Sequence, residues 1–284
     1  MIGENGIFLR VFKPGVPYRA ESFIHRDSIY VAKKECVFTV VRQEAENQLE
    51  SFSELAWLYP EEVRLLSTIA LSIPEGQGIV TFLPAERQLL SLDPLTPLHI
   101  PAVLEVAERQ AKRLLFPTET HFEVHSWSGY DPEFDIELFE EIDSADDLLI
   151  RGLYCLLKSA RLMHERDFAE EAFMNVQIAR EASLELIREV LVADGKLNPS
   201  FKDAHRYLVE NFKAGESLAD FFDHEHRQWI ATKHPSSNFG PVWIPPLIAD
   251  DFYETYEALV SVYRHLITDE PGRAALEMDE SDGG

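Results

Sequence analysis

The feature that most constrains the fold of this chain is a long C-terminal stretch, 135–270, in which apolar residues recur at helical spacing. Apolar residues three and four positions apart line one face of a helix, so each such run predicts a helix that buries one side. The runs predict helices over 146–165, 168–192, 201–212, 217–234 and 248–267. Two long helices, a short one and two more with short connections predict an all-α antiparallel helical bundle.

The last of these helices has the clearest pattern. Asp250, Asp251 and Glu254 stand in its first turns, where the helix dipole favours negative charge. Its apolar stripe comprises Ile248, Phe252, Tyr256, Leu259, Val260, Tyr263 and Ile267. The residues that follow, 271–284, are acidic, and we expect them to form a disordered tail.

The N-terminal region, 1–130, mixes short β-like runs with helical ones. Strand composition marks 7–12, 36–41, 78–83 and 120–125. Helical patterns cover 60–72 and 100–115. The segment 126–133 is rich in turn formers and is the predicted domain boundary. The sequence therefore predicts an α+β N-terminal region, with a sensing, substrate-recognition or partner-binding role, followed by the helical bundle.

The charge balance limits the kinds of partner. The chain has 26 basic and 50 acidic residues, which gives a formal net charge of −24. Surfaces that coat nucleic acid are usually basic, so any nucleic-acid contact here must be local or supplied across an oligomer interface. Cys36 and Cys155 are too few for a disulfide framework or a Cys-based zinc site. Since the sequence has no signal-peptide pattern and no apolar run that could span a bilayer, we expect a cytoplasmic protein without membrane contact.

A cation and an imidazole occur together near the end of the predicted helix 217–234. Arg227 and His234 are seven residues apart, so they lie on one face of that helix, two turns from each other. Pro235 disfavours the helical conformation for the residue before it, so the helix should end at His234. The ring of His234 would then be able to turn towards a substrate.

These residue types fit the cleavage of RNA. An imidazole titrates near neutral pH, so His234 can take a proton from a ribose 2′-hydroxyl or deliver one to the leaving 5′-oxygen. The guanidinium of Arg227 offers a fork of donors to the scissile phosphate. Lys233 can add a phosphate contact, and Gln228 can orient either partner. No cofactor or metal is required by this chemistry.

Other interpretations of the same residues are simpler. An arginine and a histidine on a helix face are most often solvated or paired with acids. His224 and His226 are about 200° apart on a helix, so they cannot hold one metal ion there. The segment 135–138, Asp-Ile-Glu-Leu, matches part of a nucleotidyltransferase pattern, but an acid-rich helix start explains it better.

The bundle and the Arg227–His234 pair together resemble the HEPN family (higher eukaryote and prokaryote nucleotide-binding domains). That family carries R-x(4 to 6)-H near the end of a late helix, and the resemblance covers 135–268. It implies a metal-independent endoribonuclease of the toxin or antiviral-defence type, with a composite site formed by a homodimer. Gln228 is a less usual residue after the arginine, and the His-x-Tyr form of the motif is absent because Pro235 and Ser236 follow His234.

Three hypotheses follow from the sequence. The first is a HEPN-type endoribonuclease that leaves a 2′,3′-cyclic phosphate, with RNA as substrate. The second is a non-catalytic HEPN-like module that binds a protein partner, a protein inhibitor or a nucleotide in the same groove, and the strongly acidic composition favours it. The third is an acidic surface that mimics nucleic acid.

Overall fold

The computed structural model describes residues 6–14, 23–25, 28–33, 36–43, 57–73, 79–86, 88–90, 97–114, 134–145, 147–164, 168–211 and 249–268. The chain divides into two compact units: unit 1 comprises 1–73 and 80–136, and unit 2 comprises 74–79 and 137–284. The predicted boundary 126–133 and the predicted strand 120–125 lie outside the described residues. The predicted domain limits therefore stay a prediction.

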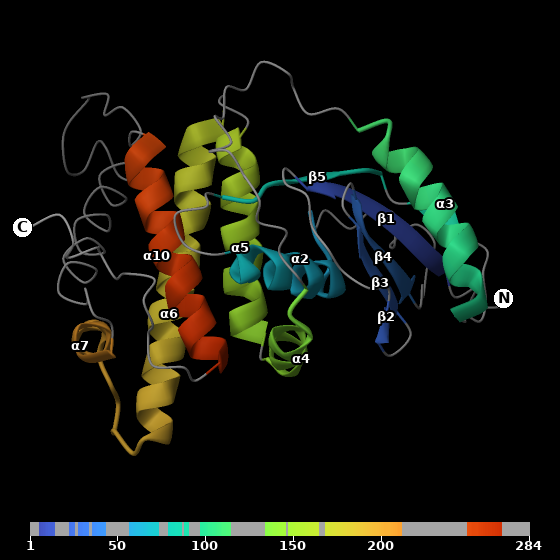
Figure 1. Ribbon diagram of the computed structural model, residues 1–284. Coiled ribbons are helices and arrows are strands. Elements are labelled where there is room, and N and C mark those ends of the chain that lie inside the picture. Colours follow the sequence, from blue (N-terminus) through green and yellow to red (C-terminus); the bar gives the residue numbers. More distant parts are fainter. Residues whose placement is uncertain are drawn as a thin grey trace, which may run out of the picture. The chain divides into compact units, whose positions relative to one another are not determined.

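Unit 1 contains an antiparallel sheet (Figure 1). Among the described residues it has six strands in the order β2-β3-β4-β1-β5, and β6 also pairs with β1. The strands are β1 (Gly6–Pro14), β2 (Phe23–His25), β3 (Ser28–Lys33), β4 (Cys36–Gln43), β5 (Phe82–Pro84) and β6 (Gln88–Leu90). Both β5 and β6 pair with the edge of β1 that β4 leaves open, β5 near its end and β6 near its start.

One face of this sheet packs against α3 (Ile100–Ala111), which follows a 3-10 turn, η1 (Pro97–His99). Leu9 pairs with Val40, and Val11 pairs with Phe38, so these side chains point to the same face. They form an apolar core with one side of the helix. The core comprises Leu9, Val11, Phe38, Val40, Val103, Ala107 and Ala111.

The other face of β1 carries a buried ion pair with α2 (Pro60–Ser72). The Nη1 atom of Arg10 lies 2.9 Å from Oε2 of Glu62, and the two side chains are 10% and 1% exposed. Arg10 also donates to the carbonyls of Trp57, at 2.5 Å, and Ala85, at 3.2 Å. The same Glu62 oxygen accepts the backbone N–H of Tyr59 at 2.8 Å, which caps the first turn of α2.

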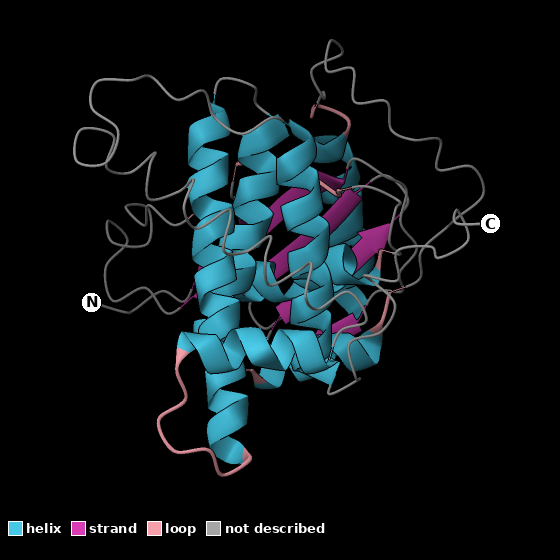
Figure 2. Ribbon diagram, turned by 90° about the vertical axis from the view of Figure 1, so that its left-hand side faces the viewer, coloured by secondary structure: helices cyan, strands magenta, loops and turns pink. Residues whose placement is uncertain are grey.

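Unit 2 is helical in the residues that the structure describes. Its helices are α4 (Ile136–Ser144), α5 (Asp147–His164), α6 (Ala169–Ala193), α7 (Phe201–Asn211) and α10 (Ala249–Thr268). The helices α5, α6 and α10 are mutually in contact and stand side by side in both views (Figures 1 and 2).

The helix directions follow from residues that meet. Tyr263 contacts Ala179 of α6 and Gly152 of α5. One turn further along α10, Leu266 lines the same cavity as Leu186 and Leu149. The residue numbers therefore rise in the same direction along α10 and α6 and in the opposite direction along α5. The predicted antiparallel packing holds for α10 against α5, whereas α10 is parallel to α6.

Tyr263 is the centre of this bundle. Its ring lies over Gly152 and its hydroxyl donates a 2.6 Å hydrogen bond to the carbonyl of Ala179. A Cβ at position 152 would overlap the Tyr263 hydroxyl, lie 2.9 Å from its Cζ, and lie 3.1 Å from Cβ of Ala182. Only glycine leaves room for a tyrosine ring at this depth between the helices.

The α+β layout predicted from the sequence is confirmed at this coarse level. The predicted helices 60–72, 146–165, 168–192, 201–212 and 248–267 correspond to α2, α5, α6, α7 and α10 within one or two residues at each end. The predicted stop at Asp194-Gly195 is also confirmed, because Gly195 has φ 88° directly after α6. The predicted helix 217–234 and the acidic tail 271–284 lie outside the described residues.

The strands differ more from the prediction than the helices do. The strands β2, β3 and β6 were not predicted, and the predicted strand 78–83 is reduced to β5, since 79–81 are irregular. A proline closes each end of the short β1–β5 ladder, because Pro14 pairs with Phe82 and Pro84 pairs with Phe12. Proline has no N–H to donate, which limits the ladder to three residue pairs.

We expect Glu62→Gln to lower the free energy of unfolding by about 3 kcal/mol, because the buried guanidinium of Arg10 then loses the negative charge that lies 2.9 Å away. Urea denaturation followed by circular dichroism measures the change. The matched control is Glu105→Gln, which removes the exposed partner of Arg109 on α3 and should cost less than about 0.5 kcal/mol. Equal stability of the two variants would contradict the role given to the buried pair.

We expect Gly152→Ala to lower the free energy of unfolding by about 2 kcal/mol, because the new methyl group meets the Tyr263 hydroxyl. Adding Tyr263→Phe removes that hydroxyl and should recover part of the loss in a double-mutant cycle. Adding Tyr256→Phe instead alters another buried tyrosine of α10 and should recover nothing. The idea fails if both double variants behave alike.

Candidate functional site

The residues predicted to carry the chemistry lie outside the described residues. Arg227, Gln228, Lys233 and His234 all fall in 212–248, so their predicted roles remain predictions. What the structure does define is the two flanks of this segment. The helix α7 ends at Asn211, just before it, and α10 begins at Ala249, just after it.

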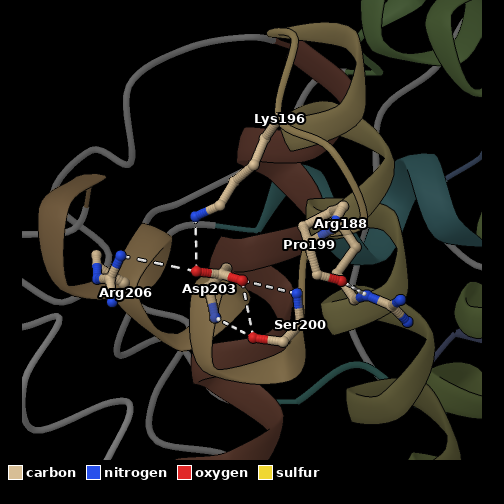
Figure 3. Close-up of polar contacts among 6 residues, drawn as sticks. All are labelled: Arg188, Lys196, Pro199, Ser200, Asp203 and Arg206. Carbon is tan, nitrogen blue, oxygen red and sulfur yellow. Dashed lines mark hydrogen bonds and ion pairs between the residues drawn. The ribbon is translucent and has the colours of Figure 1, made fainter.

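The first turn of α7 is fixed by a capping arrangement around Asp203 (Figure 3). Oδ2 of Asp203 accepts the backbone N–H of Ser200 at 2.7 Å and its hydroxyl at 2.8 Å. Oδ1 receives Nζ of Lys196 at 2.6 Å and lies 3.6 Å from Nη1 of Arg206. The Lys196 contact, followed by the Ser200 hydrogen bonds, holds the pKa of Asp203 well below its usual range.

The turn between α6 and α7 is held to α6 by Arg188. Its Nε donates to the carbonyl of Pro199 at 2.7 Å (Figure 3). Its Nη1 lies 2.5 Å from Oε2 of Glu185. Its guanidinium also stands over the ring of Phe201, 5.1 Å from the centroid. One side chain thus joins the end of α6, the turn and the start of α7.

The helix α7 is also tied to α10. The hydroxyl of Tyr207 lies 2.5 Å from Nε2 of His265, and the two rings are 5.7 Å apart. His265 belongs to the last turn of α10, so α7 sits beside the far end of the helix that follows the motif segment. The Tyr207–His265 hydrogen bond therefore fixes α7, which precedes the motif segment, against the end of α10 that is farthest from Ala249.

Unit 2 also contains a cavity of about 270 Å³. It is lined by Glu141, Ala145, Leu149, Leu186, Glu189, Val190, Leu266 and Ile267. Two carboxylates beside aliphatic walls suit an apolar group with a positive charge. Among the described residues, the polar side chains of this lining are those of Glu141 and Glu189.

Three titratable groups, Cys155, Tyr256 and Tyr263, lie in the buried core of the bundle. Burial raises the pKa of the Cys155 thiol, while the nearby charges of Arg151 and Lys158 oppose that rise. A buried thiol of this kind stays protonated at neutral pH and is a poor nucleophile. Burial likewise raises the pKa of Tyr256 and of Tyr263. These groups belong to the core.

One group of residues was not among the candidates predicted from the sequence. Arg151 and Lys158 both stand over the ring of Tyr154 on α5, at 5.2 Å and 5.9 Å from its centroid. The spacing of three and four residues was visible in the sequence as a basic and aromatic stripe.

The described residues show neither a metal-binding cluster nor a membrane-spanning helix. In these parts of the chain, no three His, Cys, Asp or Glu side chains lie close enough together to hold a metal ion. The described helices include none with the length and apolar character needed to cross a membrane. Comparisons with protein-family models, with curated proteins and with solved structures find no match for this chain.

We expect the stabilisation supplied by Asp203 to be lost in acid. Because its pKa is lowered on folding, this contribution is present above the ordinary value of 3.8 and disappears as the pH falls below it. Thermal unfolding between about pH 2 and 5 should show that Asp203→Asn removes this part of the pH dependence. Asp194→Asn, an exposed residue just after α6, is the control and should leave the profile unchanged.

Proposed function

We propose that this chain is a metal-independent endoribonuclease of HEPN type, acting as a homodimeric toxin or antiviral-defence effector in the cytoplasm. The observation that carries the proposal is the position of the Arg227–His234 pair. It lies in the segment between α7 and α10 of a helical unit whose two long helices, α5 and α6, form an antiparallel pair. The HEPN resemblance of 135–268 implies a helical unit, and this coarse feature is what supports the proposal.

The positions of the described flanks can be compared with the length of the helix predicted between them. The Tyr207–His265 contact puts the second half of α7 beside the last turn of α10. His265 and Ala249 are 16 residues apart on α10, about 25 Å at 1.5 Å per residue. The helix predicted over 217–234 would rise by a similar ~27 Å. Its length therefore suits the distance that the described ends leave open.

The proposed chemistry uses Arg227 and His234 of each protomer as catalytic residues, with Lys233 and Gln228 as substrate-binding residues. His234 of one protomer takes the proton of the ribose 2′-hydroxyl while that oxygen attacks the adjacent phosphorus. The bond from phosphorus to the 5′-oxygen breaks, and His234 of the second protomer protonates the leaving oxygen. The products are a 2′,3′-cyclic phosphate and a 5′-hydroxyl. Arg227 stabilises the charge that develops on the phosphate, Lys233 adds a phosphate contact and Gln228 orients the reacting groups.

A second candidate is a non-catalytic module that binds a protein partner or a nucleotide through the same region. The net charge of −24 favours it, because an acidic chain attracts a basic protein more readily than RNA. A stable complex with a basic protein, together with no cleavage of any RNA, would support this alternative.

We expect His234→Ala to lower the rate of RNA cleavage at least about 100-fold in excess EDTA, because the general acid and base is removed. Arg227→Ala should have a comparable effect, with partial activity in Arg227→Lys, since lysine keeps the charge without the guanidinium fork. The assay follows a labelled RNA and identifies cyclic-phosphate ends. His224→Ala is the control for loss of a nearby histidine. Loss of wild-type cleavage in EDTA would contradict a metal-independent mechanism.

A further inference from the structure

The charges of unit 2 are unevenly distributed. Among its described helices α5 is the one with an excess of basic residues: Arg151, Lys158 and Arg161 against Asp147. The helices α4, α6 and α10 each carry more acidic than basic residues, and α7 is balanced. A local positive region therefore stands within a strongly acidic chain.

The basic residues share one face of α5. At 100° per residue, Arg151, Tyr154, Lys158 and Arg161 fall within an arc of about 80°. The opposite side of the helix is buried in the bundle, as the side chains of Leu149, Leu153, Leu156 and Ala160 show. Arg151 is exposed, and the other three are partly exposed. We call these four residues the basic stripe.

The ring of Tyr154 holds two of these cations in place. Arg151 precedes it by one turn and Lys158 follows it by one turn, and each stands over the ring. Neither Arg151 nor Lys158 forms an ion pair with another described residue. Long side chains that are already positioned lose less conformational entropy when they bind an anion. Arg151 and Lys158 are therefore prepared for a ligand with repeated negative charge.

We propose that the basic stripe of α5 binds the phosphate backbone of single-stranded RNA and so holds the substrate on the helical unit. The identity of the ligand rests on the proposed ribonuclease function. An RNA strand fits because its charges repeat along a line, as the two cations do, about 10 Å apart along the helix. A guanidinium fork binds phosphate and carboxylate alike, so the choice of RNA over an acidic peptide rests on the proposed function.

The test measures RNA binding without cleavage, in the full chain with His234→Ala and excess EDTA. Fluorescence anisotropy of a labelled single-stranded RNA is followed from about 0.05 to 0.2 M salt. We expect Arg151→Gln with Lys158→Gln to weaken binding roughly 20-fold. The slope of log affinity against log salt should fall by about 1.4, or ~0.7 for each phosphate that the variant no longer neutralises.

The matched control removes one arginine and one lysine elsewhere. Arg113→Gln with Lys202→Gln changes two exposed residues outside the stripe and makes the same change in net charge. The RNA affinity of this variant should lie within about twofold of that of the His234→Ala protein, because long-range effects of exposed charges are screened. If the two double variants bind RNA equally, or if RNA does not bind at all, the proposal is overturned.

A third pair of variants tests the positioning role of Tyr154. Tyr154→Leu keeps both cations but removes the ring, so binding should weaken while the salt slope stays unchanged. Tyr154→Phe keeps the ring and should restore binding. Polyglutamate is the competing probe: if it binds the stripe and RNA does not, the ligand is an acidic protein and the RNA proposal is wrong.

The outcome is separable from that of the ribonuclease proposal. If the protein binds RNA through the basic stripe but cleaves no RNA, the binding proposal stands and the catalytic role of His234 is rejected. Cleavage that depends on His234 but not on Arg151 and Lys158 would do the reverse.

Discussion

The insertion of Tyr263 between three helices is the interaction on which the helical unit depends. Its ring fills the space that Gly152 leaves on α5, and its hydroxyl bonds to the carbonyl of Ala179 on α6. A phenol buried this deeply would be costly if its hydroxyl had no partner. The same three helices carry the surfaces for which we propose functions. The last turn of α10 holds His265 against α7, and the outer face of α5 presents the basic stripe.

In unit 1 a buried ion pair has a role comparable to that of the Tyr263 hydrogen bond. The Arg10–Glu62 pair joins residues 52 positions apart, as the Tyr263–Ala179 bond joins residues 84 apart. In each case one buried polar group connects elements that the chain order does not bring together. Such groups add modest net stability, but losing one partner is costly because the other stays buried and unsatisfied. Both therefore favour one arrangement of the elements over its alternatives.

The extent to which the fold was predictable follows from how local each signal is. The helix over Pro60–Ser72 was predicted to the residue, because Pro60 suits a first turn and the apolar period is regular. The strand Ser28–Lys33 was missed, because it is short and framed by charged residues. Its conformation comes from pairing with β4. The contact between Gly152 and Tyr263 has no local signal, since only the packed bundle brings them together.

The candidate site was predictable to a different degree. The chemistry of Arg227 and His234 can be proposed from residue type and spacing, and the described flanks, α7 and α10, are consistent with a helix between them. The cations of α5 were visible in the sequence, but their meaning was not. It required knowing which face of α5 is buried and that the helices around it carry more acid than base.

The acidic composition and an RNA substrate are compatible once distance is considered. At physiological salt the Debye length is about 8 Å, so exposed carboxylates more than one such length from a strand repel it weakly. Cations in direct contact with phosphates act at full strength and release counterions. A chain of net charge −24 therefore binds RNA only where a fixed row of cations touches it, and rejects broad coating. On the proposed function, the acids would limit where a strand can lie, and the basic stripe of α5 would be the surface that holds it.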